Sequence, residues 1–250
     1  MNTVPTVGFI SPPGLFDISP GEFPRAVEEP VRTQQAPLRG KSSNIGLSHI
    51  RNLKEEVRDN GLLLKRMGCD VVAQVGSPVA WAGAASESEA RDRCTELSEA
   101  IGAPLFMTGL AIVDALRAHG VRRVAACCGY YEDVWAAAFA GFLSLCGFTV
   151  LHASGLAEQD LGSEQCRFNE RHWCMDKDLT LRSVLSVVNA APAAQAVVST
   201  GAFTHAPHFM PQLEKEAGVP VVPGELALFW AVARFLGLTL KPGMGSLSRI

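Results

Sequence analysis

The feature that most constrains the fold is an internal duplication in the sequence. A glycine and a proline precede a short apolar run and then a helical pattern, first in residues 102–119 and again in residues 218–236. The matched residues keep one fixed offset: Gly102/Gly218, Pro104/Pro220, Leu110/Leu226, Ala111/Ala227 and Ala115/Ala231. A repeat of this kind predicts two halves with the same order of strands and helices.

Three short apolar runs in each half are typical of strands that are buried on both faces. Their ends are Ser11, Gly76 and Thr108 in the first half and Cys128, Thr200 and Gly224 in the second. Strands that alternate with helices predict an α/β fold with parallel sheets. Because open α/β sheets bind ligands at the carboxyl ends of their strands, we expect the six ends to surround one cleft if the halves face each other.

The order of these signals also predicts where the chain passes between the two lobes. The last helical pattern, 226–236, follows the third strand of the second half and would cross back to the first lobe. We therefore expect one lobe to comprise residues 1–118 together with 224–250, and the other to comprise 119–223.

The segment 14–47 contains four prolines and no sustained hydrophobic period. In a compact domain, a segment of this kind is usually a lid or a binding loop. We interpret it as a solvated loop. An anion-binding lid is the alternative, because four basic residues lie in it: Arg25, Arg32, Arg39 and Lys41. One helix is expected to follow, over 47–67, and a glycine ends it.

The stretch 120–134, near the middle of the chain, combines a strand, a turn and the start of a helix. Small and β-branched residues from Val121 to Cys128 predict the strand. Acidic residues at Glu132 and Asp133 suit the positive end of a helix dipole. Tyr130 is therefore placed at the carboxyl end of a buried strand.

Composition and charge limit the class of function. The chain has 250 residues, 48% of them hydrophobic, and a net charge of −3. No basic cluster follows a helix, so we expect a small-molecule partner and no nucleic acid. No apolar run reaches the roughly 18 residues of a membrane span, and the N-terminus lacks the pattern of a signal peptide, which favours the cytoplasm. Seven cysteines without paired spacing then indicate reduced thiols.

Four segments carry a resemblance to a known family: Pro5-Thr-Val-Gly-Phe-Ile-Ser-Pro-Pro13, Gly76-Ser77, Gly120-Val-Arg-Arg-Val-Ala with Tyr130, and Gly218-Val-Pro-Val-Val. They resemble the arylmalonate decarboxylase and maleate isomerase branch of the Asp/Glu racemase superfamily, over nearly the whole chain except 14–47 and 155–180. The resemblance implies two pseudo-symmetric, flavodoxin-like α/β lobes with parallel sheets. It also implies a cofactor-free site between them, where enediolate or carbanion chemistry is performed on small carboxylates.

The family usually has a cysteine at the end of each of two matched strands, here 70–76 and 194–200, and this chain departs from that pattern at both. The first position is Gly76, as in the decarboxylases, which also have glycine there. The second is Thr200, where the decarboxylases and isomerases would have cysteine. A threonine hydroxyl is too weak an acid to protonate a carbanion unless a neighbouring base activates it.

The resemblance also implies an anion pocket that binds the carboxylate. In the decarboxylases it is built from donors after the first strand and from a tyrosine, and Ser77 and Tyr130 match these positions. The expected substrate-binding set is Gly76, Ser77, Pro12, Tyr130 and Gly201. Pro78 stands where the family normally has a hydroxyl donor, which removes one contact. The alternative is that Ser77 and Tyr130 only satisfy the local backbone.

Glu225 is our first candidate for the acid or base that replaces the lost cysteine. It lies at the third strand end of the second half, and its leucine neighbours would raise its pKa. The alternative is an ordinary first-turn acid of the following helix. The expected catalytic set is Glu225, Tyr130, Thr200 and His205, because His205 or His208 could activate Thr200. The alternative is that His205 and His208 are ordinary surface histidines.

Cysteine and histidine suggest two further possibilities, which we regard as weaker. Cys127 and Cys128 are adjacent strand residues, so at most one could face the cleft, and core thiols are the simpler interpretation. Cys166, His172 and Cys174 lack the paired spacing of a zinc site, so we expect no metal.

Together these observations predict a cofactor-independent lyase or isomerase that acts on a small carboxylate through an enediolate or carbanion-like intermediate. A hydratase or hydrolase in which Glu225 or a histidine activates water is one alternative. A non-catalytic carboxylate-binding protein on the same scaffold is the other. A homo-oligomer is compatible with either.

Overall fold

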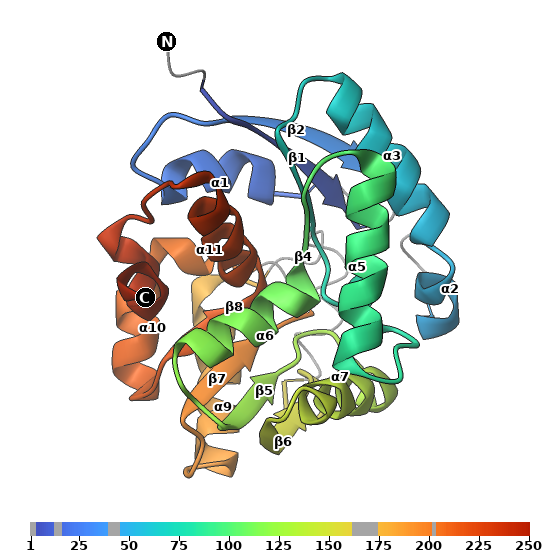
Figure 1. The fold of residues 1–250 in the computed structure, drawn as a ribbon. Coiled ribbons are helices and arrows are strands. Elements are labelled where there is room, and N and C mark those ends of the chain that lie inside the picture. Colours follow the sequence, from blue (N-terminus) through green and yellow to red (C-terminus); the bar gives the residue numbers. More distant parts are fainter. Residues whose placement is uncertain (1–3, 13–16, 40–45, 162–174, 202–203) are drawn as a thin grey trace. The chain divides into compact units, whose positions relative to one another are not determined.

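The computed structural model describes residues 4–12, 17–39, 46–161, 175–201 and 204–250. The chain forms two compact units (Figure 1). Unit 1 comprises Met1–Ala111 and Leu228–Lys241, and unit 2 comprises Ile112–Ala227 and Pro242–Ile250. Two of the three limits fall within helices, α6 (Thr108–Ala118) and α11 (Gly224–Leu236), and the third lies between Lys241 and Pro242. The lobes expected from the sequence, 1–118 with 224–250 and 119–223, stay a prediction.

Unit 1 is built on a sheet of four parallel strands. These are β1 (Thr6–Ser11), β2 (Arg32–Pro37), β3 (Val71–Gln74) and β4 (Leu105–Met107), in the order β2-β1-β3-β4. Its helices are α1 (Ser19–Ala26), α2 (Leu47–Arg51), α3 (Lys54–Arg66), α4 (Pro78–Trp81) and α5 (Glu87–Ile101). Every side chain of β3 is buried, as its apolar sequence predicts for a central strand.

Unit 2 repeats this arrangement. Its strands are β5 (Arg123–Cys127), β6 (Thr149–Ser154), β7 (Ala196–Ser199) and β8 (Val221–Pro223), all parallel and in the order β6-β5-β7-β8. Its further elements are α7 (Asp133–Leu145), α9 (Lys177–Ala190), η2 (Ala206–His208), α10 (Met210–Ala217) and η3 (Pro242–Arg249). The two sheets have the same topology, so the α/β fold with two pseudo-symmetric, flavodoxin-like lobes is confirmed.

Pairing between the strands corrects the alignment of the two halves by one residue. In unit 1, Ile10 pairs with Gln74 and Gln74 with Met107, and the equivalent row in unit 2 is Cys127, Ser199 and Pro223. Counting onward from these rows, the repeat matches Gly76 with Gly201, whereas Thr200 corresponds to Val75. This shift of one residue affects Thr200, because successive residues of a strand point to opposite faces of the sheet.

The interpretation of residues 14–47 as a loop is wrong, because this segment contains α1 and β2. Pro20 lies in the first turn of α1, where the N–H that proline lacks needs no partner in the helix. Proline at the end of an edge strand such as β2 is tolerated for the same reason. Prolines therefore mark the limits of elements here rather than their absence. Lys41 lies outside the described residues.

Two basic side chains of this segment form local ion pairs. Arg25 pairs with Glu22 at 3.2 Å within α1, and Arg39 pairs with Glu56 of α3 at 3.7 Å. These contacts favour the solvated surface over the anion-binding lid. The helix expected over 47–67 is also divided, into α2 and α3, because Leu53 begins a new helix after Asn52 ends the first.

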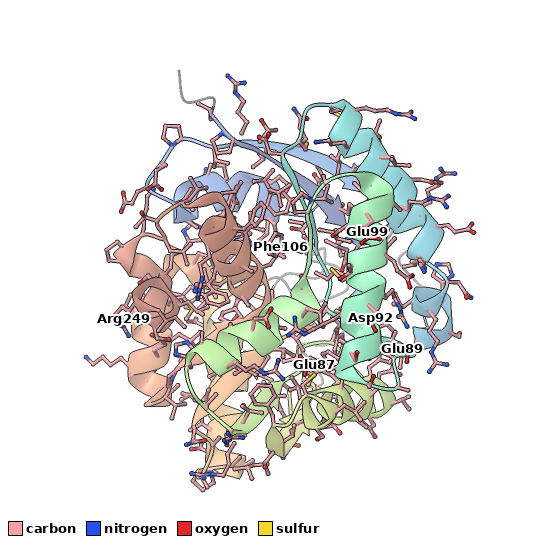
Figure 2. The ribbon with its side chains drawn as sticks, viewed as in Figure 1. Glu87, Glu89, Asp92, Glu99, Phe106 and Arg249 are labelled. Atoms are coloured by element: carbon pink, nitrogen blue, oxygen red, sulfur yellow. The ribbon has the colours of Figure 1, made fainter. Side chains whose placement is uncertain are left out.

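The core of unit 1 contains three packed aromatic rings. Phe9 of β1, Phe23 of α1 and Phe229 of α11 are all buried, and their ring centroids lie 5.3–6.3 Å apart in edge-to-face arrangements. Helix α5 also covers this unit. Its buried side chains include Ala90 and Leu97, and its other face carries the acidic residues labelled in Figure 2: Glu87, Glu89, Asp92 and Glu99. This division into two faces is the amphipathic pattern of a surface helix.

The C-terminal segment belongs to unit 2. Glu214 of α10 accepts hydrogen bonds from the backbone N–H of Val221 (3.2 Å), from the backbone N–H of Ser246 (2.8 Å) and from the Ser246 hydroxyl. Ser246 lies in η3, so one carboxylate joins η3, α10 and the start of β8. This half-buried cluster therefore holds these three elements together.

Close packing of α3 on α5 yields a test of the fold. A Cβ atom at Gly61 would lie 2.6 Å from Cγ1 of Ile101, whereas one at Gly141 of α7 would meet no atom within 4 Å. Gly61→Ala should therefore lower the free energy of unfolding by about 1–3 kcal/mol despite the better helix propensity of alanine. Gly141→Ala, the matched control, should raise it by up to about 1 kcal/mol. Urea unfolding measures both, and equal gains for the two variants would contradict the packing.

Candidate active site

Each sheet has one point where the direction of strand addition reverses. In the first sheet, β2 is added on one side of β1 and β3 on the other. In the second sheet, β6 and β7 are added on the two sides of β5 in the same way. Open α/β sheets bind ligands outside the carboxyl ends of the strands at such a switch point. The relevant ends are those of β1 and β3 in unit 1 and of β5 and β7 in unit 2, which are among the ends predicted from the sequence.

In unit 1, the segment after β3 holds Ser77 in a buried position. Ser77 is 2% exposed and immediately precedes α4, whose first residue is Pro78. The start of α6 approaches it closely, because a Cβ atom at Gly109 would lie 2.7 Å from the Ser77 carbonyl oxygen. The neighbouring Thr108 hydroxyl donates to the carbonyl of Gln74 at 3.0 Å. The ends of β3 and β4 thus fix the place of Ser77.

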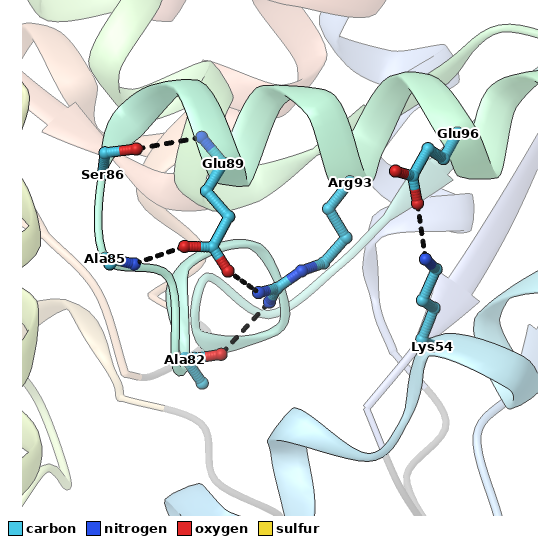
Figure 3. Close-up of polar contacts among 7 residues, drawn as sticks. All are labelled: Lys54, Ala82, Ala85, Ser86, Glu89, Arg93 and Glu96. Carbon is cyan, nitrogen blue, oxygen red and sulfur yellow. Dashed lines mark hydrogen bonds and ion pairs between the residues drawn. The ribbon is translucent and has the colours of Figure 1, made fainter.

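Helix α5 anchors the other end of this segment (Figure 3). Arg93 donates to the carbonyl of Ala82 at 3.1 Å and pairs with Glu89 at 3.4 Å. Glu89 accepts from the N–H of Ala85 at 2.8 Å, and its own N–H donates to the Ser86 hydroxyl at 3.1 Å, which caps the helix. The turn between Ser77 and α5 is therefore held at both ends.

A separate ion pair in the same view joins Lys54 of α3 to Glu96 of α5. Its two side chains are 51% and 60% exposed, so solvent screens the pair and its contribution to stability is small.

The turn at Gly76 places Pro12 and Gly76 side by side. Gly76 has φ +99°, a left-handed conformation that favours glycine. A Cβ atom there would lie 3.6 Å from both Cγ of Pro12 and Nε2 of Gln74. The fully buried Gln74 amide donates to the carbonyl of Gly76 at 3.2 Å and so braces the turn.

In unit 2, Tyr130 lies against an apolar cluster. The cluster comprises Leu156, Met175 and Leu179, with Leu161 beside it. Burial of the phenol group raises the pKa of Tyr130, because the charged form is poorly solvated there. The phenol therefore keeps its proton at neutral pH and can act as a hydrogen-bond donor.

Gly201 is close to Tyr130 through the backbone, since the N–H of Tyr130 donates to the carbonyl of Gly201 at 3.4 Å. Gly201 has φ +76°, and a Cβ atom there would lie 2.9 Å from Cδ1 of Tyr131. Both the backbone conformation and the packing thus require glycine. The structure brings together two residues of the predicted substrate-binding set.

Thr200 and Glu225 are both buried in unit 2, at 4% and 7% exposure. The N–H of Thr200 donates to the carbonyl of Cys127 at 2.9 Å and so continues the pairing of β5 with β7. Glu225 lies in the first turn of α11 and accepts a hydrogen bond from the Thr204 hydroxyl at 2.9 Å. Thr204 is 1% exposed, and no short-range pattern links it to Glu225, 21 residues later.

The histidines lie beside η2. His205 has φ +44°, unusual for a residue other than glycine, and its ring centroid is 6.2 Å from that of His208. His208 is exposed and His205 is half-buried. Activation of Thr200 by either one stays a prediction.

The adjacent thiols of Cys127 and Cys128 are inaccessible. Both are fully buried, and Sγ of Cys127 lies 3.0 Å from the hydroxyl of Ser183 on α9. Burial raises the pKa of both thiols, which suppresses the reactive thiolate. This environment favours the interpretation of core thiols. The three residues considered for a metal site, Cys166, His172 and Cys174, lie outside the described residues.

Asp17 is a buried carboxyl that sequence reasoning missed. It lies between β1 and α1, is 7% exposed, and accepts a hydrogen bond from the N–H of Ser19 at 2.6 Å. Burial raises its pKa to about 6, against the opposing effect of Ser19. The available signal was an acidic residue just before Ser19-Pro20, which is typical of a helix start.

Comparison with known proteins then identifies the family. The chain matches the family model described as arylmalonate decarboxylase over residues 40–248. It belongs to the arylmalonate decarboxylase family. The arylmalonate decarboxylase of Bordetella bronchiseptica is 26% identical over 257 residues, which cover 98% of this chain and 97% of that protein.

Solved structures show the same fold. Unliganded arylmalonate decarboxylase superposes with a TM-score of 0.78 at 24% identity, covering 98% of this chain and 99% of that chain. The maleate isomerase Iso of Pseudomonas putida S16 also has a TM-score of 0.78, at 18% identity and 98% coverage of both chains.

Membership of the family supports cofactor-independent decarboxylase or isomerase action, and thus an enzyme of lyase or isomerase type. The hydratase, hydrolase and binding-protein alternatives are not favoured. Within the described part of the chain, no helix is both long enough and apolar enough to cross a membrane.

The buried Asp17 predicts a pH-dependent cost to stability. Its pKa is raised from 3.8 to about 6 in the folded protein, so near pH 4 the carboxyl is largely protonated when folded and the penalty is small. As the pH rises past 6, the folded protein must bury the charge, at a full cost of about 3 kcal/mol. Asp17→Asn cannot ionise, so its free energy of unfolding should rise relative to wild type by up to that amount between pH 4 and 7. Urea unfolding across this range measures the difference, and a constant difference would contradict the assignment.

Proposed function

We propose that the protein is a cofactor-independent decarboxylase of malonate-type acids that carry an aryl or similar substituent. One observation carries the proposal: a member of the arylmalonate decarboxylase family has Ser77 and Tyr130 at the carboxyl ends of β3 and β5, where this fold binds ligands. Ser77 and the protonated phenol of Tyr130 bind carboxylate oxygens as donors. Gly76, Gly201 and Pro12 let the backbone approach the ligand closely.

The reaction requires stabilisation of negative charge and delivery of one proton. The bond between the α-carbon and one carboxyl group breaks, CO₂ leaves, and the electron pair remains on the other carboxyl group as an enediolate. Fixed donors such as Ser77 and Tyr130 stabilise this charge without reorganising. Glu225, in its acid form, then transfers a proton to the α-carbon and regains one from solvent.

The environment of Glu225 supports this role. Its carboxyl group is buried and oriented by the hydroxyl of Thr204 at 2.9 Å. A buried carboxyl that a hydrogen bond holds in place is suited to proton transfer. Thr200 then serves as a hydrogen-bonding wall of the site, and His205 is a second candidate for the proton donor.

Isomerisation is the second candidate reaction, favoured by the structural similarity to maleate isomerases. One such structure, the maleate cis-trans isomerase of Nocardia farcinica, contains a covalently bound succinylcysteine intermediate. In this chain Thr200 stands where the resemblance places that kind of cysteine, and Cys127 and Cys128 are buried. Decarboxylation, which needs no covalent adduct, is therefore the better supported reaction. A cytoplasmic location and a homo-oligomer stay predictions.

Binding through Tyr130 can be tested with the chain's other tyrosine as the control. Tyr130→Phe removes one hydrogen bond to a charged oxygen and should weaken the binding of phenylmalonate or phenylacetate by about 1.5–3 kcal/mol. Tyr131→Phe, which changes the adjacent ring in the same way, should leave the affinity unchanged. Calorimetric titration compares them, and normal affinity in Tyr130→Phe would refute this placement.

Proton transfer by Glu225 can be tested separately. Glu225→Gln retains the acceptor for Thr204 but carries no exchangeable acid proton, so kcat should fall by about 10²- to 10⁴-fold with KM nearly unchanged. Glu216→Gln, an exposed change on α10, is the control. Release of CO₂ from phenylmalonate is the measurement, and thiol-blocking reagents should inhibit little. Full activity in Glu225→Gln together with loss of activity in Cys127→Ala or Cys128→Ala would assign the chemistry to a thiol instead.

A further inference from the structure

The turn that follows β6 in unit 2 directs one polar side chain inward. Within residues 157–160 only Gln159 is half-buried, and the other three residues are exposed. Its Nε2 atom donates to the carbonyl of Ser154 at 2.9 Å and to the Ser154 hydroxyl oxygen at 3.1 Å. Its Oε1 atom accepts from the hydroxyl of Ser183, which is fully buried on α9. One amide group thus joins the end of β6 to α9.

These hydrogen bonds have only one consistent direction. The backbone carbonyl of Ser154 can only accept, so the NH₂ group of Gln159 must face it and the amide oxygen must face Ser183. Ser183 then gives its single proton to Gln159. Sγ of Cys127 lies 3.0 Å from the Ser183 hydroxyl and is therefore the donor in that contact. A directed chain of hydrogen bonds runs from the end of β5 through α9 to the end of β6.

The same turn is packed on the backbone to either side of Tyr130. The N–H of Leu156 donates to the carbonyl of Gly129 at 2.8 Å. A Cβ atom at Gly155 would lie 2.0 Å from the carbonyl oxygen of Tyr131, so the two segments are in direct contact there. A displacement of the turn would therefore move the backbone that carries Tyr130.

The side chain of Tyr130 packs on a cluster that the turn and α9 share. The cluster includes Leu156 of the turn and Leu179 of α9. Leu179 and Ser183 are four residues apart and so lie on the same face of the helix. Apolar contacts are non-directional, whereas a hydrogen bond has a defined length and angle. The bond between Gln159 and Ser183 therefore sets the spacing of the turn and the helix on which the tyrosine lies.

We propose that Gln159 is a positioning residue, which holds Tyr130 where its phenol can donate to the carboxylate of the ligand. The inference rests on the proposed function, because it takes Tyr130 as a carboxylate donor. Gln159 acts through the turn and α9 and not by contact with the ligand. A donor held in place by its supporting residues binds and stabilises charge without first having to reorient.

A second glutamine of the same sheet provides a matched control. Gln195 is also half-buried, and its Oε1 atom accepts from the backbone N–H groups of Arg122 at 2.9 Å and Arg123 at 3.0 Å. These bonds lie at the start of β5, whereas Tyr130 follows its other end. Gln195→Leu therefore removes structural hydrogen bonds from the sheet, as Gln159→Leu does, but at the opposite edge.

The position of Tyr130 can be measured without a ligand. The chain has two tyrosines, so labelling of tyrosine rings with ¹³C gives NMR signals from Tyr130 and Tyr131 alone, and Tyr131→Phe assigns them. Gln159→Leu should shift or broaden the signals of Tyr130, and Gln195→Leu should leave them at their wild-type positions. Unchanged Tyr130 signals in Gln159→Leu would overturn the proposal. Ser183→Ala breaks the same link from α9 and serves as the test if Gln159→Leu does not fold.

Ligand affinity then shows whether Gln159 acts through Tyr130. In calorimetric titration with phenylacetate, Gln159→Leu should weaken binding about 3- to 30-fold and Gln195→Leu should not change it. In a Tyr130→Phe background, Gln159→Leu should cause no further loss, because the donor that it positions is gone. An equal loss in both backgrounds would overturn the proposal. If Tyr130→Phe has no effect on affinity while Gln159→Leu still shifts the Tyr130 signals, Gln159 positions the ring and the role of Tyr130 in the proposed function fails.

Discussion

The candidate site depends on the register of parallel pairing at the centre of each sheet. β1 pairs with β3, and β5 pairs with β7, so that Ile10 is level with Gln74 and Cys127 with Ser199. The register determines which residue leaves the sheet first and which face its side chain takes. A slip of one residue would turn every following side chain to the other face. The register therefore determines where Ser77, Tyr130 and Thr200 leave the two sheets.

Two glycines form the turns that follow β3 and β7. Gly76 and Gly201 occupy equivalent places in the repeat, and both have a left-handed backbone. After each of them the chain turns away from the strand, which leaves backbone groups at the end of the sheet. The chain resembles the decarboxylases in having glycine at the first of these places. The repeat therefore preserves the geometry of the two turns even where the chemistry of the two halves has diverged.

Sequence reasoning predicted the repeated architecture well because buried parallel strands and their flanking glycines leave strong local patterns. It failed for α1, β2 and β6, since edge strands are half-exposed and the prolines of α1 and β2 resemble those of loops. The roles assigned to Glu225, Thr200 and His205 remain predictions. Asp17 and Thr204 could not be found from the sequence, because their significance comes from burial and from a contact between segments that are distant in the chain.

For the proposed proton transfer, buried carboxyl groups are better suited than the thiols of Cys127 and Cys128. Burial raises the pKa of Cys127 and Cys128, so their thiolates are scarce, and Cys127 is occupied by Ser183. Asp17 and Glu225 are both buried, and each accepts a hydrogen bond, from the N–H of Ser19 for one and from the hydroxyl of Thr204 for the other. Burial raises the pKa of Asp17, although its hydrogen bonds from Ser19 oppose this effect. Glu225 follows the third strand end of the second sheet on a rigid helix, which suits delivery of a proton.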